Sequence, residues 1–167
     1  MYNKGDCVVY SNNGICRIED IVIMNMQDGN KEYYLLIPIN EKSAKIYLPI
    51  NSAGQRMRMA MDEERARQLV NNIGETDTIH IVNDKEREKV YREAATSNNP
   101  YSLLAVIKTS LQRKIEREKS GKKCTAVDEK YLRVAETQLY GELAYALQSE
   151  IEQIEQTVRQ KISSDFS

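Results

Sequence analysis

The feature that most constrains the fold is a change of hydrophobic period near residue 60. Before this point, short β-prone runs alternate with turn residues such as Asn13-Gly14 and Asp28-Gly29. Beyond it, apolar residues recur every three or four positions, as they do along one face of a helix. The pattern predicts an α+β chain with two domains, residues 1–60 and residues 61–167.

The first domain is expected to contain four or five strands. Ile15, Ile21 and Ile23 share odd parity, and alternate side chains of a strand reach the same face, so these three are predicted to share one buried face. Short turns between strands, within about sixty residues, are typical of a small Tudor- or SH3-like barrel. The expected strands are 6–10, 15–26, 31–38 and 44–49.

The second domain is expected to be all-α. Asn99 can cap a helix whose first residue is Pro100, because the missing N–H of proline would be unpaired there. Apolar stripes follow at helical spacing over residues 104–115, 132–146 and 147–162. The last stripe can pack within the chain or against a second chain. We favour packing within the chain, and the other arrangement stays open.

Positive charge is concentrated in one part of a chain whose net charge is only −1. Residues 84–123 carry 11 Lys and Arg against 6 Asp and Glu. Arg113 and Arg117 lie one helical turn apart and away from the apolar stripe, and Lys89 and Arg92 add a second cluster. Such a patch can neutralise backbone phosphates. The alternative is a charged helix face that meets only solvent.

Sequence signatures of catalysis are missing. His80 is the only histidine, and the three cysteines, Cys7, Cys16 and Cys124, form no C-x-x-C pair. The chain contains no P-loop, no G-x-G-x-x-G and no nucleophile elbow. We therefore expect no enzyme, no metal site and no cofactor. Neither a signal-peptide core nor an apolar run of membrane-spanning length occurs, so we expect a cytoplasmic protein with reduced thiols.

Several segments together resemble the CarD/CdnL family of RNA-polymerase-binding transcription regulators. The front motif is also shared with the polymerase-interacting module of transcription-repair coupling factors. The segments that carry the resemblance are Lys4-Gly5-Asp6, Val8-Val9-Tyr10, Asn13-Gly14, Ile18-Glu19, residues 31–36, residues 46–49, residues 126–130 and residues 141–144.

The resemblance implies a Tudor-like domain that binds the β subunit of RNA polymerase by extending a sheet. It also implies a helical domain that contacts promoter DNA at the upstream edge of the open bubble. The expected polymerase contacts fall at or near Met24, Met26 and Tyr47. Many relatives use arginine at the first and last of these positions. Contacts in this chain are therefore expected to rest more on backbone pairing and apolar packing.

The DNA-contacting segment departs from the family pattern. Relatives place a tryptophan there, as a wedge in the minor groove, whereas this chain contains no Trp. Alignment on Tyr91 puts Arg87 at or near that position, so we expect DNA contact to survive with weaker or different bubble stabilisation. The expected DNA contacts are Arg87, Lys89, Tyr91, Arg92, Arg113 and Arg117.

The preferred hypothesis is thus a cytoplasmic bacterial transcription regulator that binds polymerase and promoter DNA. A monomer is expected, with a domain-swapped or helical-tail dimer left open. The alternative is a protein-only adaptor that binds a partner, or a second copy, through Ile151, Ile154 and Val158. A third hypothesis, an enzyme, would need a polar pocket around His80.

Overall fold

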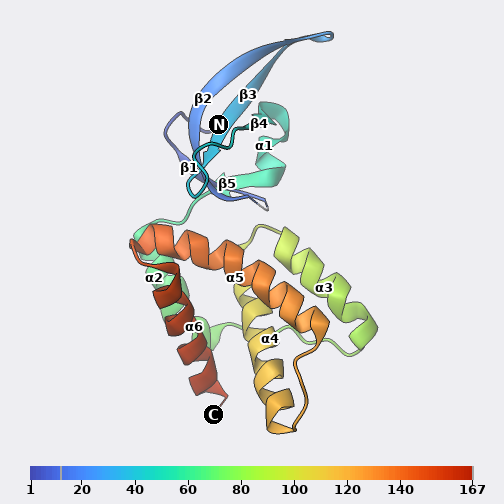
Figure 1. Cartoon of the computed structure of the whole chain (residues 1–167). Coiled ribbons are helices and arrows are strands. Elements are labelled where there is room, and N and C mark those ends of the chain that lie inside the picture. The colour runs from blue at the N-terminus through green and yellow to red at the C-terminus, as the bar shows by residue number, and fades with distance from the viewer. Residues whose placement is uncertain (12, 167) are drawn as a thin grey trace. The chain divides into compact units, whose positions relative to one another are not determined.

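The computed structural model describes residues 1–11 and 13–166 and divides into two compact units, Met1–Ala60 and Met61–Ser167. The first unit contains an antiparallel sheet, and the second consists of helices (Figure 1). The predicted α+β class is confirmed.

The sheet of the first unit has the strand order β4-β3-β2-β1-β5. The short helix α1, Ile50–Arg56, connects β4 to β5 and was not predicted. Among the described residues no ladder joins β4 to β5, so both are edge strands. The five strands are β1 Cys7–Tyr10, β2 Gly14–Met26, β3 Gly29–Pro38, β4 Ile46–Pro49 and β5 Met57–Met59.

A β-bulge in β2 decides which side chains enter the core of this unit. Cys16 and Ile18 are buried, but the register shifts between Ile18 and Asp20, and beyond the shift Ile21 pairs with buried Tyr34. One extra residue on one strand reverses the alternation of faces. The predicted common face for the three odd-numbered isoleucines is therefore wrong. Ile15 pairs with Val9 and lies on the face opposite Cys16.

The hairpin of β2 and β3 extends beyond the other strands of the sheet (Figure 1). Gly29 opens β3 with a φ of +109°, a conformation that glycine adopts without steric cost. β4 pairs with β3 only over residues 33–36. The tip of the hairpin is therefore a two-stranded ribbon with both sides of its backbone ladder unpaired among the described residues.

The second unit contains five α-helices and one short 3-10 helix among its described residues. Asn99 caps α4 by accepting from the N–H groups of Tyr101 and Ser102, and Pro100 occupies the first turn, as predicted. The elements are α2 Glu63–Asn71, η1 Ile73–Glu75, α3 Asp84–Thr96, α4 Pro100–Lys119, α5 Ala126–Leu147 and α6 Ile151–Asp165.

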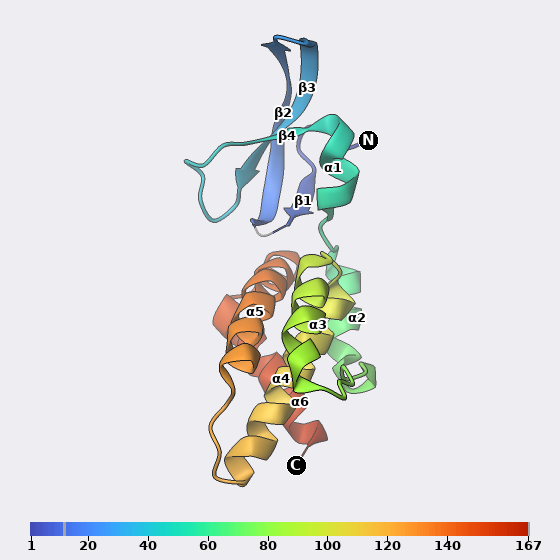
Figure 2. The ribbon, with the colours of Figure 1, turned by 90° about the vertical axis from the view of Figure 1, so that its right-hand side faces the viewer.

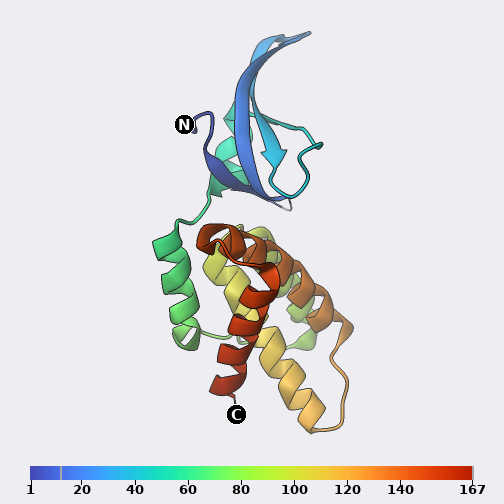
Figure 3. The ribbon, with the colours of Figure 1, turned by 60° about the vertical axis from the view of Figure 1, so that its left-hand side comes forward.

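The core of this unit forms where α4 packs against α3, α5 and α6 (Figures 2 and 3). Ile154 and Val158 of α6 are buried in this core. The packing of α6 is thus within the chain, and those two side chains are not available to a partner. Of the three residues assigned to an adaptor interface, only Ile151 is exposed. No described helix combines the length and apolarity needed to cross a bilayer.

Lys108 is a charged residue inside this core. Its Nζ donates to the carbonyl oxygens of Ile73 at 2.9 Å, Gly74 at 3.1 Å and Thr76 at 2.8 Å. The carboxylate of Asp165 lies 3.5 Å away. A buried charge is tolerated when hydrogen bonds replace its water shell. Lys108 thereby ties α4 to η1 and to the end of α6.

Candidate functional site

The C-terminal part of β2 has one unoccupied side. β1 pairs with β2 only up to Arg17, and the segment that precedes β1 bonds to the backbone of Ile18. From Asp20 to Met26, β2 pairs with β3 alone among the described residues. Alternate residues of an edge strand turn their N–H and C=O groups away from the sheet. Residues 20–26, named here the β2 edge, can therefore accept a further strand.

An apolar patch lies on the same hairpin, on the face opposite the core. Leu35 alternates with buried Tyr34 along β3, and it pairs with Tyr47 of β4. Val22 of β2 pairs with Tyr33 and shares this face, because paired residues project to the same side. We name this surface the outer-face patch. Its members are Val22, Met24, Met26, Tyr33, Leu35 and Tyr47.

The three side chains predicted to meet polymerase all belong to the outer-face patch. Tyr47 is 45% exposed, Met26 is 43% exposed, and Met24 is half-buried. Lys31 lies directly opposite Met24, and its ammonium group is 3.9 Å from the carboxylate of Asp28. The structure thus brings the predicted residues onto one apolar surface that borders the β2 edge.

Three basic side chains form a line along the exposed side of α3. Lys85, Lys89 and Arg92 are spaced four and three residues apart, and all are exposed. None has an ion pair within the described part of the chain. Glu86 and Glu93 are also exposed but lie on the neighbouring face of the helix, and exposed Glu88, beside the three basic residues, pairs with Lys130 at 3.6 Å. We name Lys85, Lys89 and Arg92 the α3 basic stripe.

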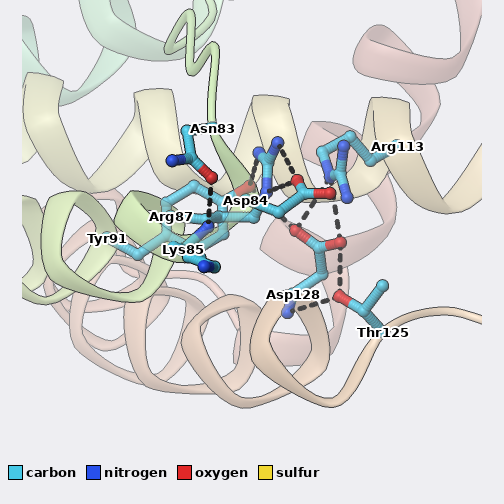
Figure 4. Close-up of polar contacts among 8 residues, drawn as sticks. All are labelled: Asn83, Asp84, Lys85, Arg87, Tyr91, Arg113, Thr125 and Asp128. Atoms are coloured by element: carbon cyan, nitrogen blue, oxygen red, sulfur yellow. Dashed lines mark hydrogen bonds and ion pairs between the residues drawn. The ribbon is translucent and has the colours of Figure 1, made fainter.

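Tyr91 and Arg113 converge instead on a buried carboxylate (Figure 4). Asp128 of α5 has no exposed surface. Its Oδ1 accepts from the Tyr91 hydroxyl at 2.8 Å, and Nε of Arg113 reaches both oxygens at 3.2 and 3.0 Å. The Thr125 hydroxyl donates to Oδ2 at 2.7 Å. These bonds join α3, α4 and α5, and they leave Tyr91 fully enclosed rather than on the basic stripe.

Arg87 lies at the edge of this network. Its Nη1 donates to the Tyr91 hydroxyl at 3.4 Å, and its Nε and Nη2 donate to Oδ1 of Asp84 at 3.2 and 3.0 Å. Hydrogen bonding to Arg87 and the charge of that residue hold the pKa of Asp84 below its usual value. Burial disfavours the charged form of Arg87, but bonds to Tyr91 and Asp84 outweigh burial and raise its pKa. Both members of the pair therefore stay charged.

Arg117 supports the loop that follows α4. Its Nε donates to the carbonyl oxygen of Lys123 at 2.7 Å. The charges of Arg113 and Arg117 also lower the pKa of Asp84. Exposed Lys119 ends α4, and exposed Lys122 and Lys123 follow in the loop.

The sequence did not predict two residues that belong to these surfaces and networks, Asp128 and Leu35. Asp128 was treated only as part of a helix cap, yet it continues the stripe of Leu132, Ala135 and Leu139 at helical spacing, which is a signal for a buried carboxylate. Leu35 was assigned to a strand, but its place beside Tyr47 needs the register of β3 and β4.

Within residues 1–11 and 13–166, no three His, Cys, Asp or Glu side chains gather as a metal site. His80 lies exposed in the segment between η1 and α3. Cys7, Cys16 and Cys124 are free thiols.

Comparison with known proteins identifies the first unit. Residues 2–61 match the family model of the CarD-like/TRCF RID domain, so the chain contains a domain of this family. The matched residues coincide closely with the unit that carries the β2 edge and the outer-face patch. A search of curated proteins finds no match.

Proposed function

We propose that this chain, with its CarD-like/TRCF RID domain at residues 2–61, is a bacterial transcription regulator that acts by binding and not by catalysis. The domain gives the chain a transcription-related role in binding RNA polymerase. In the proposal, the β2 edge and the outer-face patch bind the β subunit, and the α3 basic stripe contacts promoter DNA. The protein works in the cytoplasm, where polymerase and promoter are found.

The observation that carries the polymerase half is the pairing gap along the β2 edge. Residues 20–26 have a strand on one side only, among the described residues. Asp20 is the only charged residue in residues 20–26. This stretch contains no proline, so each of its residues has a backbone N–H. A polymerase strand that joined this edge would gain main-chain hydrogen bonds, while the adjoining side chains would supply specificity.

The outer-face patch supplies the side-chain part of the proposed interface. Tyr47 and Met26 still expose apolar surface that a partner would bury. Aromatic residues at the centre of an interface often contribute most of its affinity. Met24 and Tyr47 carry no charge, whereas many relatives have arginine at both positions. We infer that these two residues contact polymerase mainly through apolar packing.

The DNA half rests on the free charges of the α3 basic stripe. Lys85, Lys89 and Arg92 are exposed and form no ion pair within the described part of the chain. Phosphate contacts by such residues release counterions, and the affinity then falls steeply with salt. Lys122 and Lys123, in the loop after α4, add further positive charge to this unit. The expected contacts are to phosphates, and they carry no sequence information by themselves.

The polymerase half is tested with the full chain and purified core polymerase. Tyr47→Ala should weaken binding by about tenfold, because it removes a central aromatic contact. Met24→Glu should act in the same direction by placing a charge in the patch. Met59→Glu is the matched control, since Met59 is an exposed methionine of the same sheet on β5. Equal binding by all three variants would contradict the polymerase half.

The DNA half is tested with labelled duplex DNA over a series of salt concentrations. Lys89→Gln and Arg92→Gln should each weaken binding about fivefold at low salt and reduce the salt slope by about one. Lys161→Gln removes the same charge from an exposed position of α6 and is the control. Polymerase binding should be unchanged in all three. A salt slope that is the same in stripe variants and control would refute DNA contact by α3.

A further inference from the structure

The first turn of α3 contains an ion pair whose two members differ sharply in exposure. The side chain of Arg87 is 8% exposed, whereas that of Asp84 is 85% exposed. Two Arg87 nitrogens donate to a single oxygen of Asp84, at 3.2 and 3.0 Å. A mostly buried guanidinium thus bonds to a carboxylate on the surface.

Two further guanidinium groups lie near the same carboxylate. In Figure 4 the Asp84 carboxylate lies beside the guanidinium groups of Arg87 and Arg113, and the charge of Arg117 also acts on it. The printed bonds of Arg113 and Arg117 use Nε, to Asp128 and to the Lys123 carbonyl. Their terminal Nη atoms have no hydrogen-bond partner within the described part of the chain. The cluster therefore still offers donors to an anion.

We propose that Arg87, Arg113 and Arg117 form a binding site for a backbone phosphate of nucleic acid, and that Asp84 occupies this site in the free protein. The inference rests on the DNA contact proposed for α3 and goes one step further. A phosphate presents two oxygens and a negative charge to a guanidinium fork, as a carboxylate does. Asp84 is therefore an internal substitute for the ligand.

Replacement of the Asp84 carboxylate by a phosphate is expected to cost little free energy. Asp84 is exposed, so water solvates its carboxylate on release, and the phosphate then takes the place of that carboxylate on the mostly buried Arg87 guanidinium. The helix N-terminus at Asp84 favours a negative group whether it is a carboxylate or a phosphate. On the surface of α3, Asp84 lies between the basic stripe, which begins at Lys85, and Arg87 on the buried side of the helix. Removal of the Asp84 charge should consequently raise affinity for DNA.

The experiment measures fluorescence anisotropy of labelled duplex DNA with the full chain at several salt concentrations. Asp84→Asn should bind about fivefold more tightly at low salt, because the competing charge is gone. Its salt slope should be steeper by about one phosphate contact. Glu86→Gln is the matched control: Glu86 lies in the same turn, is exposed and has no ion pair within the described residues. It should change the affinity by less than about twofold, since only the general field changes.

A double variant separates a local site from a general gain of charge. Arg87→Met in the Asp84→Asn background should abolish the gain, with folding verified by circular dichroism. Equal gains from Asp84→Asn and Glu86→Gln would overturn the phosphate site and leave the proposed DNA contact intact, provided that Lys89→Gln still weakens binding. If the unmodified chain shows no salt-dependent DNA binding, the phosphate site and the DNA half of the proposed function both fail.

Discussion

Asp128→Asn should destabilise the helical unit by about 3 kcal/mol. Three donors reach the two carboxylate oxygens, from Tyr91, Arg113 and Thr125. Asparagine has one acceptor oxygen and one NH₂ group in place of the two carboxylate oxygens. At least one of the three donors would therefore face the NH₂ group, which is itself a donor. Removal of one partner of a buried ion pair costs about 3–5 kcal/mol. The low end applies, because the side chain of Arg113 is 25% exposed and water can solvate part of its charge.

The assay is urea denaturation of the full chain followed by circular dichroism at the helix band. A double-mutant cycle with Arg113→Met isolates the ion pair from the other bonds of Asp128. The double variant should lose less than the sum of the single losses, because each single change leaves one charge unpaired. A loss below about 1 kcal/mol for Asp128→Asn would refute the reasoning, and so would strict additivity in the cycle.

Three further predictions test other parts of the structure. Lys108→Met should cost about 2 kcal/mol in urea denaturation, because three carbonyl groups at the end of η1 lose their donor; an unchanged midpoint would contradict this. Asn99→Ala should cost about 1 kcal/mol through loss of the α4 cap, and Asn99→Asp, which keeps the acceptor, serves as its control. Burial raises the pKa of the Cys16 thiol from 9.0 to about 11, so the folded protein holds this proton where the unfolded chain has released it. The resulting stability is complete below pH 9 and is lost as pH rises to about 11. Iodoacetamide at pH 9 should accordingly label half-buried Cys7 well before Cys16, and simultaneous labelling would speak against a buried thiol.

The sequence predicted those parts of the fold that depend on neighbouring residues. The cap at Asn99 and the apolar stripe of α4 are local patterns of side-chain chemistry and spacing, and the structure has both. Helix α1 was missed because Ile50–Arg56 is short, contains Gly54 and buries only Ala53. A single buried position gives no period from which a helix can be inferred.

The candidate site was predictable only in part, because its interactions join distant segments. Tyr91 and Asp128 are separated by 37 residues, and nothing in the sequence near either residue specifies that they meet. Lys89 and Arg92 could be assigned to an exposed basic face by spacing alone. The same spacing puts Arg87 on the face of Tyr91 and Ala95, but the enclosure of its guanidinium depends on the packing of α3 against α4 and α5.

The bulge at Glu19 sets the phase in which the rest of β2 is displayed. Upstream of it, the side chains of the core come from even positions; downstream, even positions such as Met24 form the outer-face patch. Deletion of this single residue would leave Ile18 opposite Leu36 and Asp20 opposite Leu35 in regular alternation, so Ile21 would stay on the core face and Met24 on the outer face. A one-residue loss between Asp20 and Val22 would instead exchange the faces of the residues beyond it, so that Ile23 would face outward and Met24 inward while Cys16 and Ile18 kept their places.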